Sequence, residues 1–319
     1  MKKIRVGVVG VGYLGKFHAQ KYHRMENVDL VGVVDINESN AREIAEQYDT
    51  RYFNSYQALF GKVDAVSIAV PTSDHFAVSR DFLKHGVDVL IEKPITTTLA
   101  EADDLLEIAE ANGLLIQVGH LERFNPAVVA MEDLVNTPRF IESHRLGIFK
   151  PRGTDVSVVL DLMIHDIDII LNYVRSEVKA VHAAGIPVIT NEVDIANARL
   201  EFENGCVANV TASRISTRNE RKIRLFQQDA YISVDFANHE ITAIRRDGRA
   251  RSDDVIPGMN IDKRCFTKGD ALDDEIKSFI SSVETRREPE VTGHMGRDAL
   301  NIALSIMHQI SETSGKIVG

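Results

Sequence analysis

Cysteine is scarce in this chain of 319 residues, which has only Cys206 and Cys265 and no CxxC pair. Disulfide frameworks and cysteine zinc sites are therefore excluded. No apolar run reaches the length of a membrane-spanning helix. The apolar stretch after Lys2 and Lys3 is interrupted by glycines and lacks a cleavage site, so it is not a signal peptide. We expect a cytoplasmic protein without membrane contact.

Basic residues are too few to dominate the surface charge. The chain has 37 Lys and Arg against 47 Asp and Glu, a formal net charge of −10. This balance argues against nucleic acid or an anionic membrane as the main partner. The apolar fraction of 44% and the charged fraction of 26% are those of an ordinary globular protein, long enough for two domains.

The most informative stretch is a glycine pattern near the start. The apolar run at residues 3–9 leads into GVGYLG at residues 10–15, and a helix is expected to follow. This order forms the pyrophosphate-binding turn of a dinucleotide-binding fold. Gly10 allows the tight turn, Gly12 lets a phosphate approach the backbone, and Gly15 lets the helix pack close to the strand. The helix N-terminus adds free N–H groups and a positive dipole end.

An acidic residue follows the second predicted strand. Residues 28–34 are apolar and end in Asp35, which is 20 residues after Gly15. A carboxylate there can accept hydrogen bonds from both hydroxyls of the adenosine ribose. Ile36 and Asn37 follow, so no cation is adjacent to offset a 2′-phosphate. The pattern therefore favours NAD over NADP as the cofactor.

Two folding patterns divide the chain. Apolar strands and helices alternate up to residue 118, which predicts a parallel α/β sheet. Further on, one amphipathic helix at 121–135 precedes a series of strands rich in β-branched residues, interrupted by a helix at 159–174. We predict an NAD-binding Rossmann domain at 1–120. A substrate-binding and oligomerisation α+β domain with an open, mainly antiparallel sheet is predicted at 121–319.

Polar residues follow two more strands of the predicted parallel sheet. Residues 71–75, Pro-Thr-Ser-Asp-His, are expected to form a turn after one strand, and Glu92, Lys93 and Pro94 follow the next. Ligands of open α/β sheets bind at such carboxyl ends. Lys93 is unlike the purely apolar strand before it, so it is expected to hydrogen-bond a substrate hydroxyl and exchange its proton, with Glu92 orienting it.

The helix at 159–174 is apolar except for a polar stripe. Four residues share this face: Asp161, His165, Asp168 and Asn172. At about 100° per residue they lie within roughly 60° of one another, whereas Asp166 lies elsewhere. Asp161 and His165 are at i and i+4, and a carboxylate beside an imidazole suits a general base. The alternatives are a buried structural pair and a divalent metal site; we expect no metal because no further ligand cluster is evident.

These motifs together resemble one known family. GVGYLG, the VPTSDH run at 70–75, Glu92-Lys93-Pro94 and the DLMIHD run at 161–166 are similar to the glucose–fructose oxidoreductase/inositol dehydrogenase (Gfo/Idh/MocA) family. The resemblance implies NAD(P)-dependent redox chemistry on sugars, cyclitols or nucleotide sugars. It also implies a homodimer or homotetramer that associates through the open sheet of the second domain.

The resemblance assigns roles to individual residues. Lys93, Asp161 and His165 would form the catalytic group, and the choice of base between Lys93 and His165 stays open. The residues expected at the NAD cofactor are Gly10, Gly12, Tyr13, Leu14, Gly15, Asp35, Pro71, Thr72, His75, Glu92, Lys93 and His120.

Two further runs narrow the expected substrate. Residues 119–128 and 147–152 look most like those of family members that oxidise the 3-hydroxyl of UDP-N-acetylglucosamine to a 3-keto sugar. Cations near the cleft would suit a diphosphate. Inositol or simple sugar oxidation and a non-catalytic NAD(H)-binding regulator are the alternatives. The residues expected at the substrate are Arg123, Asn125, Lys150, Arg152, Asp161 and His165.

Overall fold

The computed structural model describes residues 3–151, 154–246, 258–267 and 269–314. The chain forms two compact units. The first consists of Met1–Leu121 with Asp270–Leu300, and the second consists of Glu122–Gly269 with Asn301–Gly319. Each unit has its own sheet and is described by itself.

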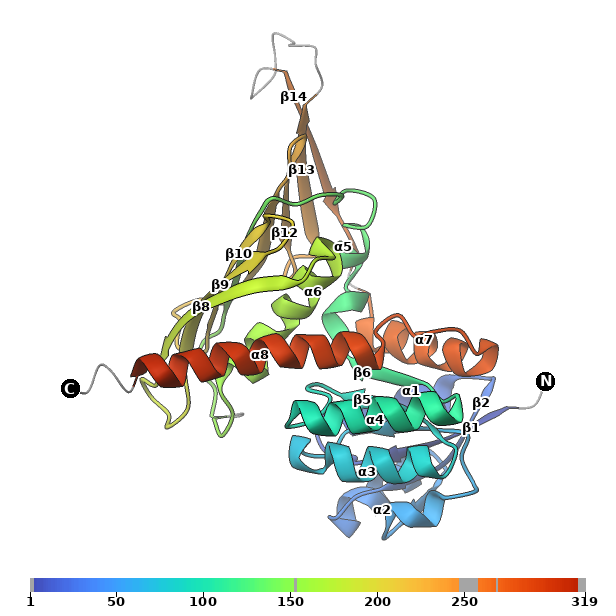
Figure 1. The fold of residues 1–319 in the computed structure, drawn as a ribbon. Coiled ribbons are helices and arrows are strands. Elements are labelled where there is room, and N and C mark those ends of the chain that lie inside the picture. Colours follow the sequence, from blue (N-terminus) through green and yellow to red (C-terminus); the bar gives the residue numbers. More distant parts are fainter. Residues whose placement is uncertain (1–2, 152–153, 247–257, 268, 315–319) are drawn as a thin grey trace. The chain divides into compact units, whose positions relative to one another are not determined.

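A six-stranded parallel sheet is the centre of the first unit (Figure 1). Its strand order, β3-β2-β1-β4-β5-β6, is that of a doubly wound dinucleotide-binding fold, so the predicted Rossmann domain is confirmed. The short strand β3 was not predicted, because it has only three residues. The strands are β1 (Ile4–Val9), β2 (Val28–Val34), β3 (Arg51–Phe53), β4 (Ala65–Ile68), β5 (Asp88–Glu92) and β6 (Ile116–Gly119).

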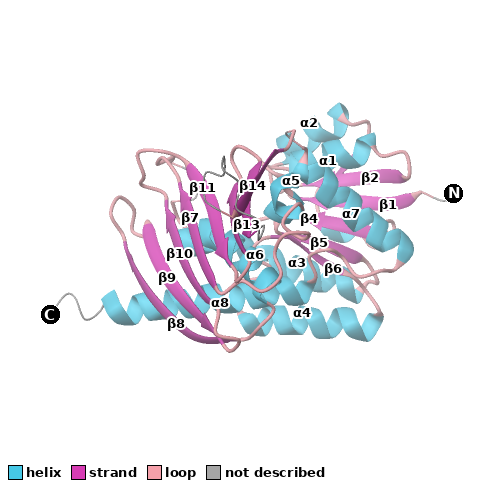
Figure 2. Ribbon diagram, turned by 90° about the horizontal axis from the view of Figure 1, so that it is seen from above, coloured by secondary structure: helices cyan, strands magenta, loops and turns pink. Residues whose placement is uncertain are grey.

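Helices cover both faces of this sheet (Figure 2). α3 (Thr72–Lys84) and α4 (Leu99–Asn112) lie on one face, and α1 (Gly15–Arg24) and α2 (Glu38–Gln47) lie on the other. A short 3₁₀ helix, Tyr56–Leu59, follows β3. The helices that connect the parallel strands therefore form one layer on each face of the sheet, as the alternation of strands and helices predicts.

Local sequence signals set the ends of two of these helices. Asn37 accepts a hydrogen bond from the backbone of Ser39 and caps α2. Thr98 and Glu101 form the predicted capping box of α4, and Gly113 ends that helix in the left-handed conformation with φ of 64°.

The first unit also contains a segment from far along the chain. We predicted one continuous second domain at 121–319, but Asp270–Leu300 belongs to the first unit. The apolar face of α7 (Ala271–Thr285) joins the same buried core as α1 and β1. Arg286 bonds the carboxylate of Asp88, and α8 (Gly293–Ser314) starts against β6. Burial of this apolar face accounts for the difference.

The second unit is built on an eight-stranded sheet in the order β14-β13-β12-β11-β7-β10-β9-β8. Neighbouring strands are antiparallel except β7 and β10, so the predicted mainly antiparallel sheet is confirmed. Strand β14 was not predicted. The strands are β7 (Phe140–Leu146), β8 (Val178–Ile186), β9 (Ile195–Phe202), β10 (Val207–Ser213), β11 (Glu220–Phe226), β12 (Ala230–Asp235), β13 (Glu240–Arg246) and β14 (Met259–Cys265).

The predicted helix at 121–135 is wrong. The segment forms a 3₁₀ turn, Leu121–Phe124, and one short α-helix, α5 (Pro126–Val129). Pro126 has no N–H and cannot continue a helix, so Asn125 caps a new start instead. Among the described helices of the chain, none combines the length and apolar composition needed to cross a bilayer.

Candidate active site

The glycine turn between β1 and α1 has the geometry that a pyrophosphate requires. Gly10 has φ of +83°, and a Cβ there would lie 2.6 Å from the carbonyl oxygen of Ala69. A Cβ on Gly15 would lie 1.8 Å from the carbonyl oxygen of Gly10. A Cβ on Gly12 would have nothing within 4 Å. The first and third glycines are thus needed by the fold, and the second leaves open space for a ligand.

The surroundings of this turn fit an anion. Helix α1 has no acidic residue in its first turn, so its N–H groups and positive dipole end are not neutralised from within. Leu14 occupies the N-cap position, and Tyr13 is 64% exposed beside the turn. Asp35 at the end of β2 accepts hydrogen bonds from the backbone N–H groups of Val11 and Asn37, both at 2.8 Å.

A cavity of about 610 Å³ extends from the glycine turn along the carboxyl ends of β1, β2 and β4. Gly10, Gly12, Asp35 and Pro71 line it, together with polar residues of the segment at 54–57. Among the described residues that line this cavity there is no Lys or Arg. The lining fits the ribose of NAD and offers no partner for a 2′-phosphate.

The segment at 71–75 is not the turn that we predicted. Pro71 is the N-cap of α3, and Thr72 is the first residue of that helix. Proline is favoured at helix starts because its φ is already suitable and its missing N–H is not needed there. His75 is buried between two carbonyl oxygens, 2.8 Å from that of Pro94 and 3.0 Å from that of Val70. Burial lowers the pKa of His75, and in the neutral form its single ring N–H donates to one of these two carbonyl oxygens.

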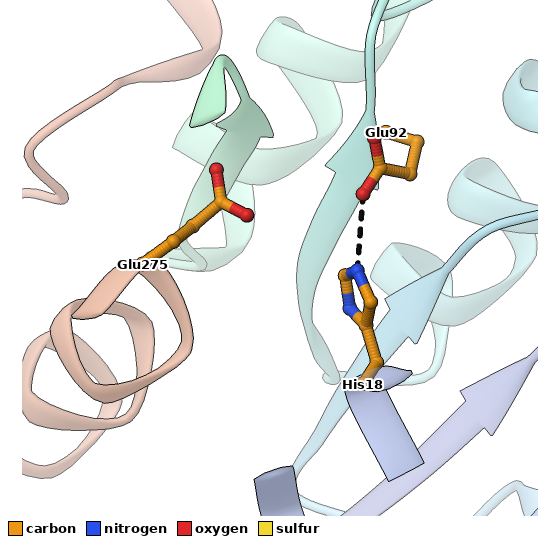
Figure 3. A group of neighbouring side chains, drawn as sticks. All are labelled: His18, Glu92 and Glu275. Atoms are coloured by element: carbon orange, nitrogen blue, oxygen red, sulfur yellow. Dashed lines mark hydrogen bonds and ion pairs between the residues drawn. The ribbon is translucent and has the colours of Figure 1, made fainter. Parts of the chain in front are cut away.

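Glu92 ends β5 and is held by a residue that our sequence reasoning missed. His18 of α1 lies with Nε2 3.0 Å from Glu92 Oε1 and with Nδ1 3.1 Å from Ser67 Oγ. A Cβ on Gly119 would lie 3.0 Å from Glu92 Oε2. Glu275 of α7 is the third member of this buried group (Figure 3). His18 follows Gly15 by three residues. Residues three apart share a helix face, and Gly15 is on the face that packs against the sheet.

Lys93 and His120 follow the ends of β5 and β6. Lys93 is half-buried and is joined to Pro94 by a cis peptide bond. His120 is 1% exposed. Both residues belong to the first unit, on the same sheet edge as the glycine turn.

The polar stripe of the second unit differs from a regular α-helix. Val159–Met163 is a π-helical turn that continues into α6 (Ile164–Val174). The wider turn shifts Asp161 relative to His165, and both residues are half-buried. The sequence pattern could not predict this π-helical turn, because such turns have no strong composition signal.

Two other acids of α6 have structural partners. Asp166 Oδ2 accepts a hydrogen bond from Arg145 Nε at 2.7 Å, and both side chains are almost completely buried. Asp168 lies 3.7 Å from Arg123 in a second buried ion pair. Glu122 also contacts Arg145 at 2.9 Å. These acids therefore stabilise the second unit, which leaves Asp161 and His165 as the candidates for chemistry on this stretch.

Besides Asp161 and His165, the expected substrate residues fall into three groups. Arg123 is buried against Asp168, and Asn125 is buried as the cap of α5. Lys150 is exposed. Arg152 lies outside the described residues.

A glycine turn open to an anion, an acid at the second strand end and a cavity between them define a dinucleotide-binding protein. The chain belongs to the Gfo/Idh/MocA family. The model described as "oxidoreductase family, NAD-binding Rossmann fold" matches residues 4–120, and the "GFO/IDH/MocA C-terminal domain" model matches residues 139–233. NAD is accordingly its cofactor.

Relatives cover the whole chain. UDP-N-acetylglucosamine 3-dehydrogenase of Acidithiobacillus ferrooxidans is 41% identical over 307 residues, 96% of this chain and 97% of that protein. The solved structure of GnnA from that organism has a TM-score of 0.90 at 39% identity and covers 97% of this chain and 98% of its own. Myo-inositol 2-dehydrogenase of Thermotoga maritima is 24% identical over 328 residues, 97% of each chain.

Proposed function

We propose that this protein oxidises the 3-hydroxyl of UDP-N-acetylglucosamine to the 3-keto sugar with NAD. The observation that carries the proposal is the 41% identity, over nearly the full length of both chains, to the A. ferrooxidans enzyme of that name. The shared fold supports the proposal. The two structures align with a TM-score of 0.90 over 97% of this chain and 98% of the other, which leaves no room for a large insertion in either.

The catalytic roles follow from residue chemistry. His165, oriented by Asp161, takes the proton of the sugar hydroxyl as its carbon is oxidised. Lys93 holds the same oxygen and stabilises the charge that develops on it. The alternative is that Lys93 accepts the proton instead of His165. Bound NAD supplies the hydride acceptor. The neighbouring acids Asp166 and Asp168 are excluded from this role by their buried arginine partners.

The sugar nucleotide also needs partners for its diphosphate. Lys150 is exposed. We assign two cations, Lys150 and Arg152, to the phosphates. Arg123 has a buried carboxylate partner on α6, so its role in this proposal is to hold α6 rather than to bind phosphate.

The test is a substrate panel followed by the absorbance of NADH. UDP-N-acetylglucosamine, N-acetylglucosamine and myo-inositol are each offered with NAD and, separately, with NADP. We expect turnover with the nucleotide sugar and NAD. Turnover with myo-inositol alone would identify an inositol dehydrogenase, and NADH binding without turnover on any substrate would identify a regulator.

Paired variants test the roles. Lys93→Met and His165→Ala should each lower kcat at least about a hundredfold while NADH still binds. Lys84→Met and His182→Ala change exposed residues of the same types and should leave kcat unchanged. Near-normal turnover in both Lys93→Met and His165→Ala would contradict the mechanism.

A second copy of this chain is the partner that we propose. On β7, Ile141 and Arg145 face α6, so Phe140 is on the opposite face of the sheet. Phe226 lies beside Phe140 with ring centroids 5.7 Å apart, and Tyr231 lies beside Phe226 at 5.0 Å. This aromatic row on the open face suits a homodimer or homotetramer in the cytoplasm, and light scattering of the purified protein measures its size.

A further inference from the structure

Glu275 is a buried carboxyl group with no obvious reason to be there. It lies on α7, is 1% exposed, and points toward β5 in Figure 3. Among the described residues, neither of its carboxylate oxygens has a hydrogen-bond partner. A buried carboxyl without a partner is costly, and such a group in a folded protein calls for an explanation.

Two ionisable side chains of the first unit face it. Ligand atoms of His18, Glu92 and Glu275 all lie within 4.8 Å of one another. Tyr22 from α1 also faces Glu275, which contributes to raising the pKa of Tyr22 after the larger effect of burial. From β6, Gln117 donates its amide N–H to the backbone carbonyl of Glu275 at 3.1 Å.

Among these described neighbours, no Lys or Arg pairs with Glu275. Lys21, the buried lysine of α1, is bonded to Asp270 at the start of α7. Burial, followed by the charge of Glu92, raises the pKa of Glu275 well above its ordinary value. A buried carboxyl beside a second carboxyl and without a partner cation favours its neutral form, in which it is a hydrogen-bond donor.

The hydrogen bonds of this group have one consistent direction. A carboxylate only accepts, so His18 donates from Nε2 to Glu92, and in that tautomer of the neutral ring its Nδ1 accepts from Ser67. The Ser67 hydroxyl in turn accepts from Tyr22, 2.7 Å away. These donors thus point toward Glu92 from the side of α1.

We propose that Glu275 is a positioning residue: as a neutral acid it holds the Glu92 carboxylate from one side while His18 holds it from the other. No direct hydrogen bond joins Glu275 to Glu92, and the 4.8 Å limit on their separation suits one bridging water. Lys93 follows Glu92 directly on the same backbone, so we expect a shift of the Glu92 backbone to move Lys93 as well. The expected effect of Glu275 on turnover rests on the proposed role of Lys93. Its expected effect on the position of the Glu92 carboxylate does not.

Three variants test the proposal through pH profiles of kcat and of NADH affinity. Glu275→Gln keeps a neutral donor and should match the parent protein at neutral pH within about twofold. Glu275→Leu removes the donor and should lower kcat about tenfold, the size of one hydrogen bond to a charged group. The parent should lose activity as Glu275 ionises at high pH, and Glu275→Gln should lack that loss. Glu284→Gln changes an exposed glutamate of α7 and is the control.

Infrared spectroscopy gives a readout that needs no turnover. At neutral pH the parent should show the carbonyl band of a protonated carboxyl, and Glu275→Gln should lack it. This result stands even if the sugar substrate is different from the one proposed, so the two proposals fail separately.

Three outcomes would overturn the inference. The first is a Glu275→Gln variant as impaired as Glu275→Leu, since that would mean an ionised carboxylate is required. The second is an infrared band that is unchanged in Glu275→Gln. The third is one equivalent of metal on the purified protein that Glu275→Gln loses, because His18, Glu92 and Glu275 would then be cation ligands.

Discussion

The Asp35 carboxylate accepts a hydrogen bond from the backbone N–H of Val11, with 2.8 Å between the two atoms. This bond links the end of β2 to the glycine turn between β1 and α1. The other carboxylate oxygen accepts from the backbone of Asn37 at 2.8 Å. The acid that we expect at the ribose therefore also fixes the glycine turn that we expect at the pyrophosphate, and one substitution changes both.

Substitution of Asp35 by serine should weaken NADH binding about tenfold, the equivalent of one hydrogen bond to a charged group. The ratio between the NADH and NADPH affinities should shrink, because the carboxylate no longer repels a 2′-phosphate. Fluorescence titration with both nucleotides measures this. Asp29→Ser on the exposed side of β2 is the control, and a parent protein that prefers NADPH would refute the argument.

Two glycines of the same turn should respond differently to alanine. Gly15→Ala places a Cβ 1.8 Å from the Gly10 carbonyl oxygen and should lower the free energy of unfolding by at least about 3 kcal/mol. Gly12→Ala meets nothing within 4 Å and should change stability by less than about 0.5 kcal/mol. NADH affinity should nevertheless fall in Gly12→Ala, because its methyl group occupies the phosphate's space. Denaturant unfolding and NADH titration separate the two effects, and equal stability losses would contradict this assignment.

Much of the first unit is predictable because its signals are local. The glycine turn, Asp35, the Asn37 cap and the Thr98 capping box each depend on residues within a few positions of one another. Glu275 could not be placed in this way. It lies 183 residues after Glu92 in the sequence, and only tertiary packing of α7 brings the two carboxyl groups together.

The polar stripe shows a second limit of sequence patterns. A regular helical period separates Asp166 from the stripe and includes Asp168, yet both acids are buried against arginines. The partners Arg145 and Arg123 lie outside the helix, so periodicity within it cannot reveal them. The periodicity of a helix predicts the direction of a side chain but not which charged residue of another element lies next to it.

Removing Asp166 should destabilise the second unit strongly. The Arg145 guanidinium is 4% exposed, and although burial disfavours its charge, Asp166 and Glu122 raise the pKa of Arg145 overall. Asp166→Ala leaves this cation short of a partner and should cost about 3–5 kcal/mol of unfolding free energy. Asp229→Ala, at an exposed aspartate, should cost less than about 0.5 kcal/mol. A loss in Asp166→Ala as small as in the control would contradict the buried-pair assignment.

The turn between β8 and β9 should give the second unit an acid-sensitive stability. Asp194 is fully buried and accepts three backbone hydrogen bonds at 2.7–2.8 Å, from Val188, Ile189 and Thr190. Burial alone would raise the pKa of Asp194, but these bonds outweigh it and lower the pKa well below its ordinary value of 3.8.

Because the folded pKa is the lower one, the stabilisation by Asp194 is complete above pH 3.8 and is lost as the pH falls below it. Asp194→Asn cannot carry the charge and should be less stable than the parent by about 3 kcal/mol at neutral pH. The difference should shrink on acidification, since the parent then loses the same interaction. Urea unfolding of both proteins at neutral and acidic pH measures this, and a difference that is independent of pH would show that the charge of Asp194 is not what stabilises the turn.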